Sequence, residues 1–242
     1  MKTPNSVKIE LQAVDALRLL LENVPAIKSV EVHIVEQQPD AGIDLVATVT
    51  AFGREHKLVA EVKSSGQPRH VRSALLSLRD YAKRQADQIT PILIAPYLSP
   101  QAQDLCREFG VAYLDLEGNA RLAFGTFFLS RQFAKRPVVE RRELRSFKPK
   151  SIQVLKVLLR EPSKPWRVAD LAEAAGVSLG HVSNVRNSLL DREWAQLAEE
   201  GMFLAAPDTL LDAWREAYEA PSGQRQAFYT TLHGVSFDAA LR

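Results

Sequence analysis

The sequence predicts a mixed α/β domain followed by a smaller, mainly helical unit. Helical and strand-like patterns alternate over residues 6–130, residues 150–205 are mainly helical, and a basic, proline-containing stretch separates the two. The length of 242 residues suits one or two domains. The expected parts are a first domain at 1–133, a basic linker at 134–147, a helical unit at 148–207 and a helical tail at 208–242.

The elements of the first domain follow from periodicity and turn signals. Helices are expected at 6–23, 70–86 and 99–110, and strands at 29–36, 43–51, 55–63, 89–95, 111–116 and 120–130. The turn Phe52-Gly53-Arg54 joins the second and third strands, which should form a hairpin. Ser99 and Pro100 suit the N-cap and first position of a helix. This order favours a mixed sheet covered by helices.

Composition excludes several classes of protein. Hydrophobic residues make up 46% and charged residues 25%, as in an ordinary soluble globular protein, and the net charge is only +2. The single cysteine, Cys106, excludes an intrachain disulfide and is expected to be a core residue. The sequence shows no membrane span, signal peptide, zinc spacing, phosphate-cradling loop or nucleophile elbow. We therefore expect a cytoplasmic location, without membrane contact, ATP use or acyl chemistry.

The expected linker region is strongly basic. Between Arg131 and Lys150 there are eight basic and two acidic residues, a local charge of +6. Such a stretch can contact phosphates in a salt-dependent way. A solvated run of charge is the equally acceptable alternative.

The candidate catalytic residues are Asp44, Glu61 and Lys63. Side chains at i and i+2 in a strand share a face, so Glu61 and Lys63 project together. If the two strands form a hairpin, Asp44 at the start of the first lies beside the end of the second. Two converging carboxylates can hold Mg²⁺, which polarises a phosphate and lowers the pKa of a bound water, while the ammonium stabilises developing charge.

A structural explanation of this trio remains open, because Glu61 and Lys63 could be solvated charges on an edge strand. Three features favour the catalytic interpretation: the upstream Asp44, the apolar surroundings LVAEVK, and the basic residues of the following helix. Those basic residues are Arg69, Arg72 and Arg79.

With its segments GID (42–44) and EVK (61–63) and its order of elements, the first half resembles the PD-(D/E)XK nuclease superfamily. The resemblance implies a restriction-endonuclease-like fold that uses Mg²⁺, or Mn²⁺, to cut DNA. Asp44 and Glu61 would be the metal ligands, and Lys63 the catalytic lysine. Members often add a glutamate from the first helix, for which Glu10 and Glu22 are candidates.

The second half predicts three helices and a short β pair. Helices are expected at 150–160, 168–175 and 179–192, and a hairpin turns at Glu199-Glu200-Gly201. The third helix has Val182, Val185 and Leu189 on its inner face. Its outer face and flanks carry small or hydrogen-bonding groups without a carboxylate, as a helix entering the DNA major groove requires. These candidate DNA-binding residues are Ser178, Gly180, His181, Ser183, Asn184, Arg186 and Asn187.

The pattern RVADLAEAAGVSLGHVSNVRNSLLDREW resembles a winged helix-turn-helix, although three-helix modules of this kind also serve protein contacts. The two halves together are similar to AbiEi-type antitoxins and transcriptional regulators of bacteria, which implies repression through the winged helix. The last residues resemble the start of a further unit, so a native chain that continues beyond residue 242 is one interpretation.

Two functional hypotheses follow. The first is a metal-dependent DNA endonuclease that the winged helix targets. The second is a non-cleaving antitoxin-type regulator, whose nuclease-like half binds DNA, a cognate toxin or a second protomer.

Overall fold

The computed structural model describes residues 4–35, 42–85, 88–133, 149–217 and 229–240. The expected basic linker at 134–147 therefore lies outside the described residues. Within the described ranges, no helix is both long and apolar enough to cross a membrane.

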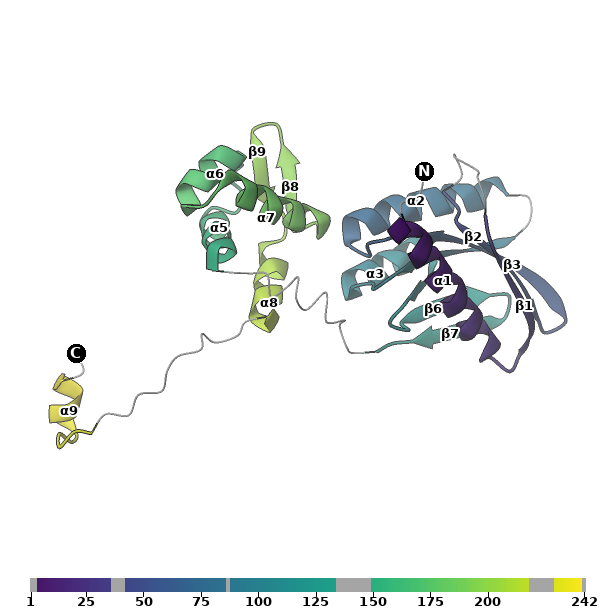
Figure 1. The fold of residues 1–242 in the computed structure, drawn as a ribbon, viewed down its shortest axis with the longest axis horizontal. Coiled ribbons are helices and arrows are strands. Elements are labelled where there is room, and N and C mark those ends of the chain that lie inside the picture. The colour runs from purple at the N-terminus through teal and green to yellow at the C-terminus, as the bar shows by residue number, and fades with distance from the viewer. Residues whose placement is uncertain (1–3, 36–41, 86–87, 134–148, 218–228, 241–242) are drawn as a thin grey trace.

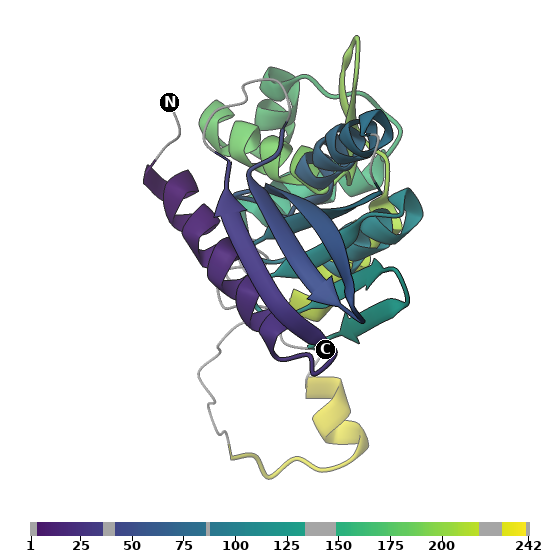
Figure 2. The same cartoon turned by 90° about the vertical axis from the view of Figure 1, so that its right-hand side faces the viewer.

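The first domain is built on one seven-stranded mixed sheet whose spatial order follows the chain. Figures 1 and 2 show the domain from two directions, with α1 lying against the sheet. The inner strands β3, β4 and β5 run parallel, and every other neighbouring pair is antiparallel. The strands are β1 Ile27–Ile34, β2 Leu45–Ala51, β3 Arg54–Val62, β4 Ile89–Ala95, β5 Ala112–Asp115, β6 Ala120–Phe124 and β7 Phe127–Arg131. This mixed α/β architecture is compatible with the nuclease-like fold that the sequence predicts.

Helices cover both faces of the sheet, so the domain has two hydrophobic layers. Helix α1 (Pro4–Glu22) packs on one face, where Leu17 and Leu21 meet residues such as Ala60. Helices α2 (Pro68–Arg84) and α3 (Pro100–Phe109) pack on the other face. Successive residues of β3 therefore point into opposite layers, and this alternation sets which layer each side chain at the carboxyl end of β3 faces.

Local sequence signals predicted much of this domain correctly. The β2–β3 hairpin is confirmed, with Ala51 opposite Arg54 at its turn. The Ser99 hydroxyl accepts a hydrogen bond from the Ala102 amide at 3.2 Å, and α3 ends at Gly110 with a left-handed φ of 67°. These caps satisfy backbone groups that a helix leaves without partners at its ends.

The single strand expected at 120–130 is wrong. The chain turns between β6 and β7, and Phe124 pairs with Phe127 across that turn. Gly125 adopts a φ of 54°, a left-handed conformation that glycine reaches without steric cost. The apolar pattern continues through the turn, so periodicity alone did not mark it.

Cys106 is a core residue, as the sequence predicts. Its side chain is buried between α3 and the sheet, and burial raises the pKa of the thiol to about 12.

This burial predicts an unreactive thiol. Because the reactive thiolate forms only near the raised pKa, native protein at pH 8 should not react with a disulfide reagent such as DTNB. Protein unfolded in guanidinium should release one equivalent of chromophore. Rapid reaction of the native protein with DTNB would show that the Cys106 thiol is not buried.

The second unit has a hydrophobic core of its own, formed by three helices, a hairpin and a fourth helix. They are α5 Pro149–Arg160, α6 Val168–Ala175, α7 Leu179–Asp191, β8 Ala195–Ala198, β9 Gly201–Leu204 and α8 Pro207–Ala217. Leu210 of α8 is completely buried, so this helix belongs to the packed unit. In contrast, α9 (Val235–Ala240) has no buried residue.

The two units meet where α2 contacts the end of α7. Arg72 donates two hydrogen bonds of 2.9 Å to the Glu193 carboxylate, a paired geometry that orients both side chains. Arg69 and His70 lie 3.9 and 3.8 Å from the Asp191 carboxylate. Exposed ion pairs contribute little individually, so this contact orients the units more than it stabilises them.

Candidate nuclease-like site

The three predicted catalytic residues come together at the carboxyl end of β3. The backbone of Asp44, just before β2, is hydrogen-bonded to Val35, which directly follows β1, and to Ala60 of β3. Its Oδ2 atom accepts a hydrogen bond of 2.8 Å from the Val62 amide, between Glu61 and Lys63. The hairpin therefore places the Asp44 carboxylate directly against the EVK segment.

Glu61 and Lys63 form an ion pair within this cluster. Lys63 Nζ lies 2.5 Å from Glu61 Oε1, and the lysine side chain is 34% exposed whereas that of Glu61 is 6% exposed. The other oxygen, Glu61 Oε2, is buried and has no hydrogen-bond partner among the described residues. Buried carboxylate oxygens are normally satisfied, so this oxygen has an unused capacity to bind a donor or a cation.

The environment of Glu61 shifts its acidity. Burial raises the pKa of the Glu61 carboxyl, the hydrogen bond and the charge of Lys63 lower it in part, and the nearby Asp44 charge raises it again. Removing water from the ionised form is the largest of these effects. A cation beside Oε2 would compensate this cost directly.

All three side chains lie on the face of the sheet that α2 and α3 cover. Val59, two residues before Glu61, belongs to the core layer of α2 and α3, whereas Ala60 belongs to the layer of α1. Gly42 lies close to Glu61 Oε2 and to Ser77 of α2, since a Cβ added there would be 3.6 Å from the oxygen. The site is thus enclosed between the end of β3 and α2.

The first helix offers one buried glutamate. Glu10 is 4% exposed and accepts a hydrogen bond of 3.2 Å from Ser6, whereas Glu22 is exposed at the end of α1. However, α1 covers the opposite face of the sheet. Among the described residues, no group of three or more carboxylates, histidines or cysteines is close enough to hold a metal ion.

The arginines of α2 are engaged elsewhere. Arg69 and Arg72 contact Asp191 and Glu193 of the second unit, and the guanidinium of Arg79 lies 5.3 Å from the ring centre of Phe109. Their presence near Glu61 in sequence was one reason for the catalytic interpretation. The structure does not place them as a basic wall of this site.

Asp115 lies at the same edge of the sheet and was missed by the sequence reasoning. It is fully buried at the end of β5 and accepts hydrogen bonds from the amides of Leu98, Glu117 and Asn119 and from the Asn119 side chain. Burial raises the pKa of Asp115, and these hydrogen bonds lower it in part. With its oxygens used in this way, Asp115 ties two loops together. An aspartate before Glu-Gly-Asn is a turn signal that could have indicated this role.

The predicted DNA-binding residues lie on α7 and just before it. Ser178 caps the helix by accepting a hydrogen bond from the His181 amide. Ser178, Gly180, Asn184 and Asn187 are exposed, and His181, Ser183 and Arg186 are half-buried.

His181 differs from the exposed members of this set. Its Nε2 atom lies 3.1 Å from the Ser151 hydroxyl of α5, so the ring is directed toward the neighbouring helix. The exposed amides of Asn184 and Asn187 are therefore the strongest candidates on α7 for contacts with base edges.

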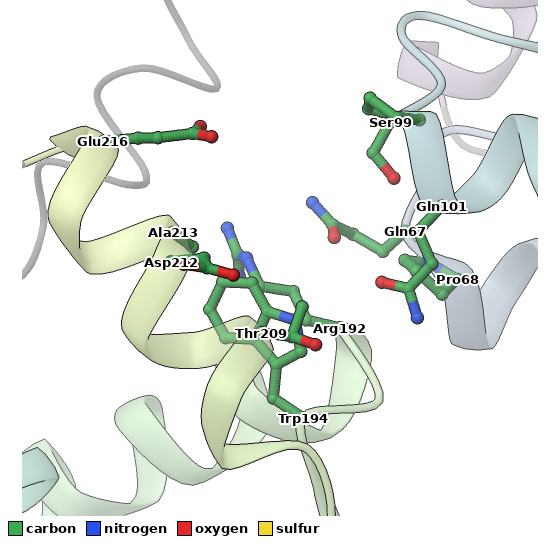
Figure 3. Close-up of a pocket in the computed structure, with 11 residues that line it drawn as sticks. Gln67, Pro68, Ser99, Gln101, Arg192, Trp194, Thr209, Asp212, Ala213 and Glu216 are labelled. Atoms are coloured by element: carbon green, nitrogen blue, oxygen red, sulfur yellow. The ribbon is translucent and has the colours of Figure 1, made fainter.

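A small cavity of about 190 Å³ lies where the units meet, and Figure 3 shows the side chains around it. Arg192 and Trp194 line one side, and Gln67, Ser99 and Gln101 line the other. The Arg192 guanidinium lies 5.4 Å from the Trp194 ring centre and donates hydrogen bonds to Ser188. These contacts show that the Arg192 side chain is already engaged within the second unit.

No protein-family model and no curated protein matches the chain. Among solved structures, it is similar to EndoMS in apo form, with a TM-score of 0.29 and 20% identity over 42% of this chain and 44% of the other. It is also similar to the EndoMS-dsDNA2 complex, with a TM-score of 0.28 and 19% identity over 47% and 45%. The chain thus spans less than half the length of these proteins. TM-scores this low carry no information about function, and the AbiEi-type resemblance stays a prediction from the sequence.

Proposed function

We propose that this protein is a DNA-binding protein whose first domain cleaves phosphodiester bonds with the help of a divalent cation. The observation that carries this proposal is the convergence of Asp44, Glu61 and Lys63, with Glu61 Oε2 buried and without a partner among the residues that the structure describes. A merely structural ion pair would not require a second carboxylate beside it or leave a buried oxygen unsatisfied.

The residues present fit a magnesium or manganese ion. Asp44 and Glu61 would hold it, because Mg²⁺ in nucleic-acid enzymes is usually bound by one or two carboxylates, with water and substrate phosphate as the other ligands. When bound, such a cation supplies Lewis-acid polarisation of a phosphodiester. Two carboxylates are therefore sufficient without a third from α1.

Each side chain has a separate role. Lys63, which is partly exposed, can leave Glu61 and stabilise negative charge on the substrate phosphate. The Val62 amide orients Asp44, and the enclosing layer of α2 holds Glu61 in place. The positions of the carboxylates are therefore set by backbone and packing before substrate binds.

The test is the nicking of supercoiled plasmid DNA with Mg²⁺ or Mn²⁺ and with EDTA. Wild type should cut only with metal, and Lys63→Ala should be inactive. Glu55→Gln, which changes an exposed carboxylate of the same strand, is the matched control and should remain active. If wild type and Lys63→Ala are equally inert on duplex, single-stranded, branched and mismatched DNA, cleavage is excluded.

We further propose that α5, α6, α7 and the β8–β9 hairpin act as a winged helix-turn-helix. The exposed Asn184 and Asn187 would approach base edges in the major groove, since an asparagine amide can form two hydrogen bonds with adenine. The hairpin turn carries Glu199 and Glu200, so the wing is poorly suited to phosphate contact.

This arrangement predicts the effect of the two asparagines. Asn184→Ala or Asn187→Ala should weaken binding to duplexes selected from a random pool by about 1–3 kcal/mol, while Asp44→Ala changes binding little. Electrophoretic mobility shift at fixed salt measures the effect. Undiminished affinity in the double variant would show that α7 does not recognise bases.

A non-cleaving regulator is the second candidate, and the exposed face of α7 favours it because this face does not depend on the nuclease-like site. In that case the first domain would bind DNA, a toxin or a second protomer. Specific operator binding together with no cleavage under any metal condition would support this candidate. Full DNA affinity after deletion of residues 146–242 would contradict it.

A further inference from the structure

A second candidate site lies at the other end of the sheet. Arg54 and Glu61 lie seven residues apart on β3, so this end is roughly 20 Å from the nuclease-like site at about 3.3 Å per residue. Here a cavity of about 470 Å³ opens between the β2–β3 turn, the starts of β4 and β5 and the β6–β7 turn. Nothing in the proposed cleavage mechanism uses it.

The lining of this cavity is basic. Arg54, Lys57 and Arg121 contribute three cationic side chains, His56 contributes an imidazole, and Gln88 and Thr90 add neutral polar groups. None of the described residues that line it is a carboxylate.

The cationic side chains of this cavity are not paired with carboxylates of the described residues, as arginines with a purely structural role usually are. Arg54 and Lys57 are exposed and have no ion pair with a described residue, and Arg121 lies over the ring of Phe128 at 5.6 Å. The cavity also includes Gly110 at the end of α3, where a helix carries about half a negative charge. Three cations exceed this partial charge, so the cavity keeps a net positive potential.

The cavity also has a firm shape. The ring of His56 packs against Phe124 with a centroid distance of 4.9 Å, and a Cβ at Gly125 would be only 2.8 Å from the imidazole. His56 is therefore held in place beside the β6–β7 turn. Apolar residues such as Ile89 and Val111 form another part of the wall.

We propose that this cavity binds a phosphate group carried by a small molecule, such as a mononucleotide. The cationic side chains would bind the phosphate through charge-assisted hydrogen bonds, and the apolar wall would contact the organic part. The volume suits a single small ligand. Free inorganic phosphate offers the same binding chemistry, so the experiment has to distinguish the two sources.

The test is isothermal titration calorimetry of the full chain with AMP, adenosine and inorganic phosphate, together with amide chemical-shift mapping. AMP should bind, adenosine should not, and the shifts should centre on residues that line the cavity. Arg54→Gln and Lys57→Gln should each weaken AMP binding about fivefold, since each removes one charged contact. Lys156→Gln, which changes an exposed lysine of α5, is the matched control and should bind normally.

The outcomes separate clearly. Tighter binding of AMP than of phosphate would identify a nucleotide-like ligand. Equal binding of both would identify free phosphate as the ligand. Either result supports a phosphate-binding site in this cavity. Absence of binding by AMP and phosphate overturns the proposal, as does binding that both cavity variants retain. Binding of an oligonucleotide but of neither small molecule also overturns it. Melting curves of the variants exclude unfolding as a cause.

Discussion

Glu61→Gln should abolish metal-dependent cleavage while leaving the protein as stable as the wild type, or more stable. The substitution keeps the size of the side chain but removes the charge that a cation needs, so cleavage should fall by roughly 100-fold or more. Stability should not fall, because burial of the ionised carboxyl already costs free energy in the wild type, and Oε2 has no hydrogen bond with any described residue that the substitution could break. Lys63 is 34% exposed and can be hydrated when its partner is neutral.

The pH dependence provides a second measurement of the same effect. Burial raises the pKa of Glu61 in the folded protein. The contribution of Glu61 to stability is therefore fully present below pH 4.5, the ordinary pKa of a glutamate, and is lost as the pH rises through the raised pKa. The stability of Glu61→Gln relative to wild type should therefore increase with pH in this window. Thermal unfolding at about pH 4 to 8, with Glu55→Gln as the exposed control, measures it. Strong destabilisation of Glu61→Gln at neutral pH would show that Glu61 has a structural role.

Gly66→Ala should be among the most destabilising single substitutions in the first domain. A Cβ at Gly66 would overlap the Tyr97 carbonyl oxygen and lie 2.9 Å from its carbonyl carbon. Both atoms are backbone, so no side-chain rotation can relieve the clash. We expect a loss of about 3 kcal/mol or more, equivalent to a decrease in melting temperature of about 6 to 12 °C for a chain of this length.

The same substitution should also reduce cleavage, since Gly66 lies in the short connection between Lys63 and α2. Gly180→Ala in α7 is the matched control for stability, because a Cβ there meets no atom within 4 Å. Its stability should be unchanged or higher by up to about 1 kcal/mol, as alanine favours a helix over glycine. Equal melting of Gly66→Ala and wild type would contradict the close approach of the two loops.

Sequence patterns by themselves determined the local structure of this protein and the candidate catalytic trio. The alternation of apolar residues and the turn at Phe52-Gly53 defined the β2–β3 hairpin, and a hairpin necessarily brings the start of one strand beside the end of the next. The distance between Asp44 and Glu61 along the chain was therefore sufficient to predict their proximity. Helix caps were equally local, since their hydrogen bonds span only a few residues.

Only the tertiary structure decided which of these groups are available for chemistry. Burial of Glu61 depends on α2, and the engagement of Arg72 depends on Glu193, 121 residues away in sequence. The basic cavity likewise gathers Arg54 and Arg121 from β3 and β6. Burial, charge pairing and close approach arise from contacts between distant segments, and no short pattern encodes them. For this reason the sequence predicted that Asp44, Glu61 and Lys63 lie together, while only the fold shows that one oxygen of Glu61 has no partner in the described part of the chain.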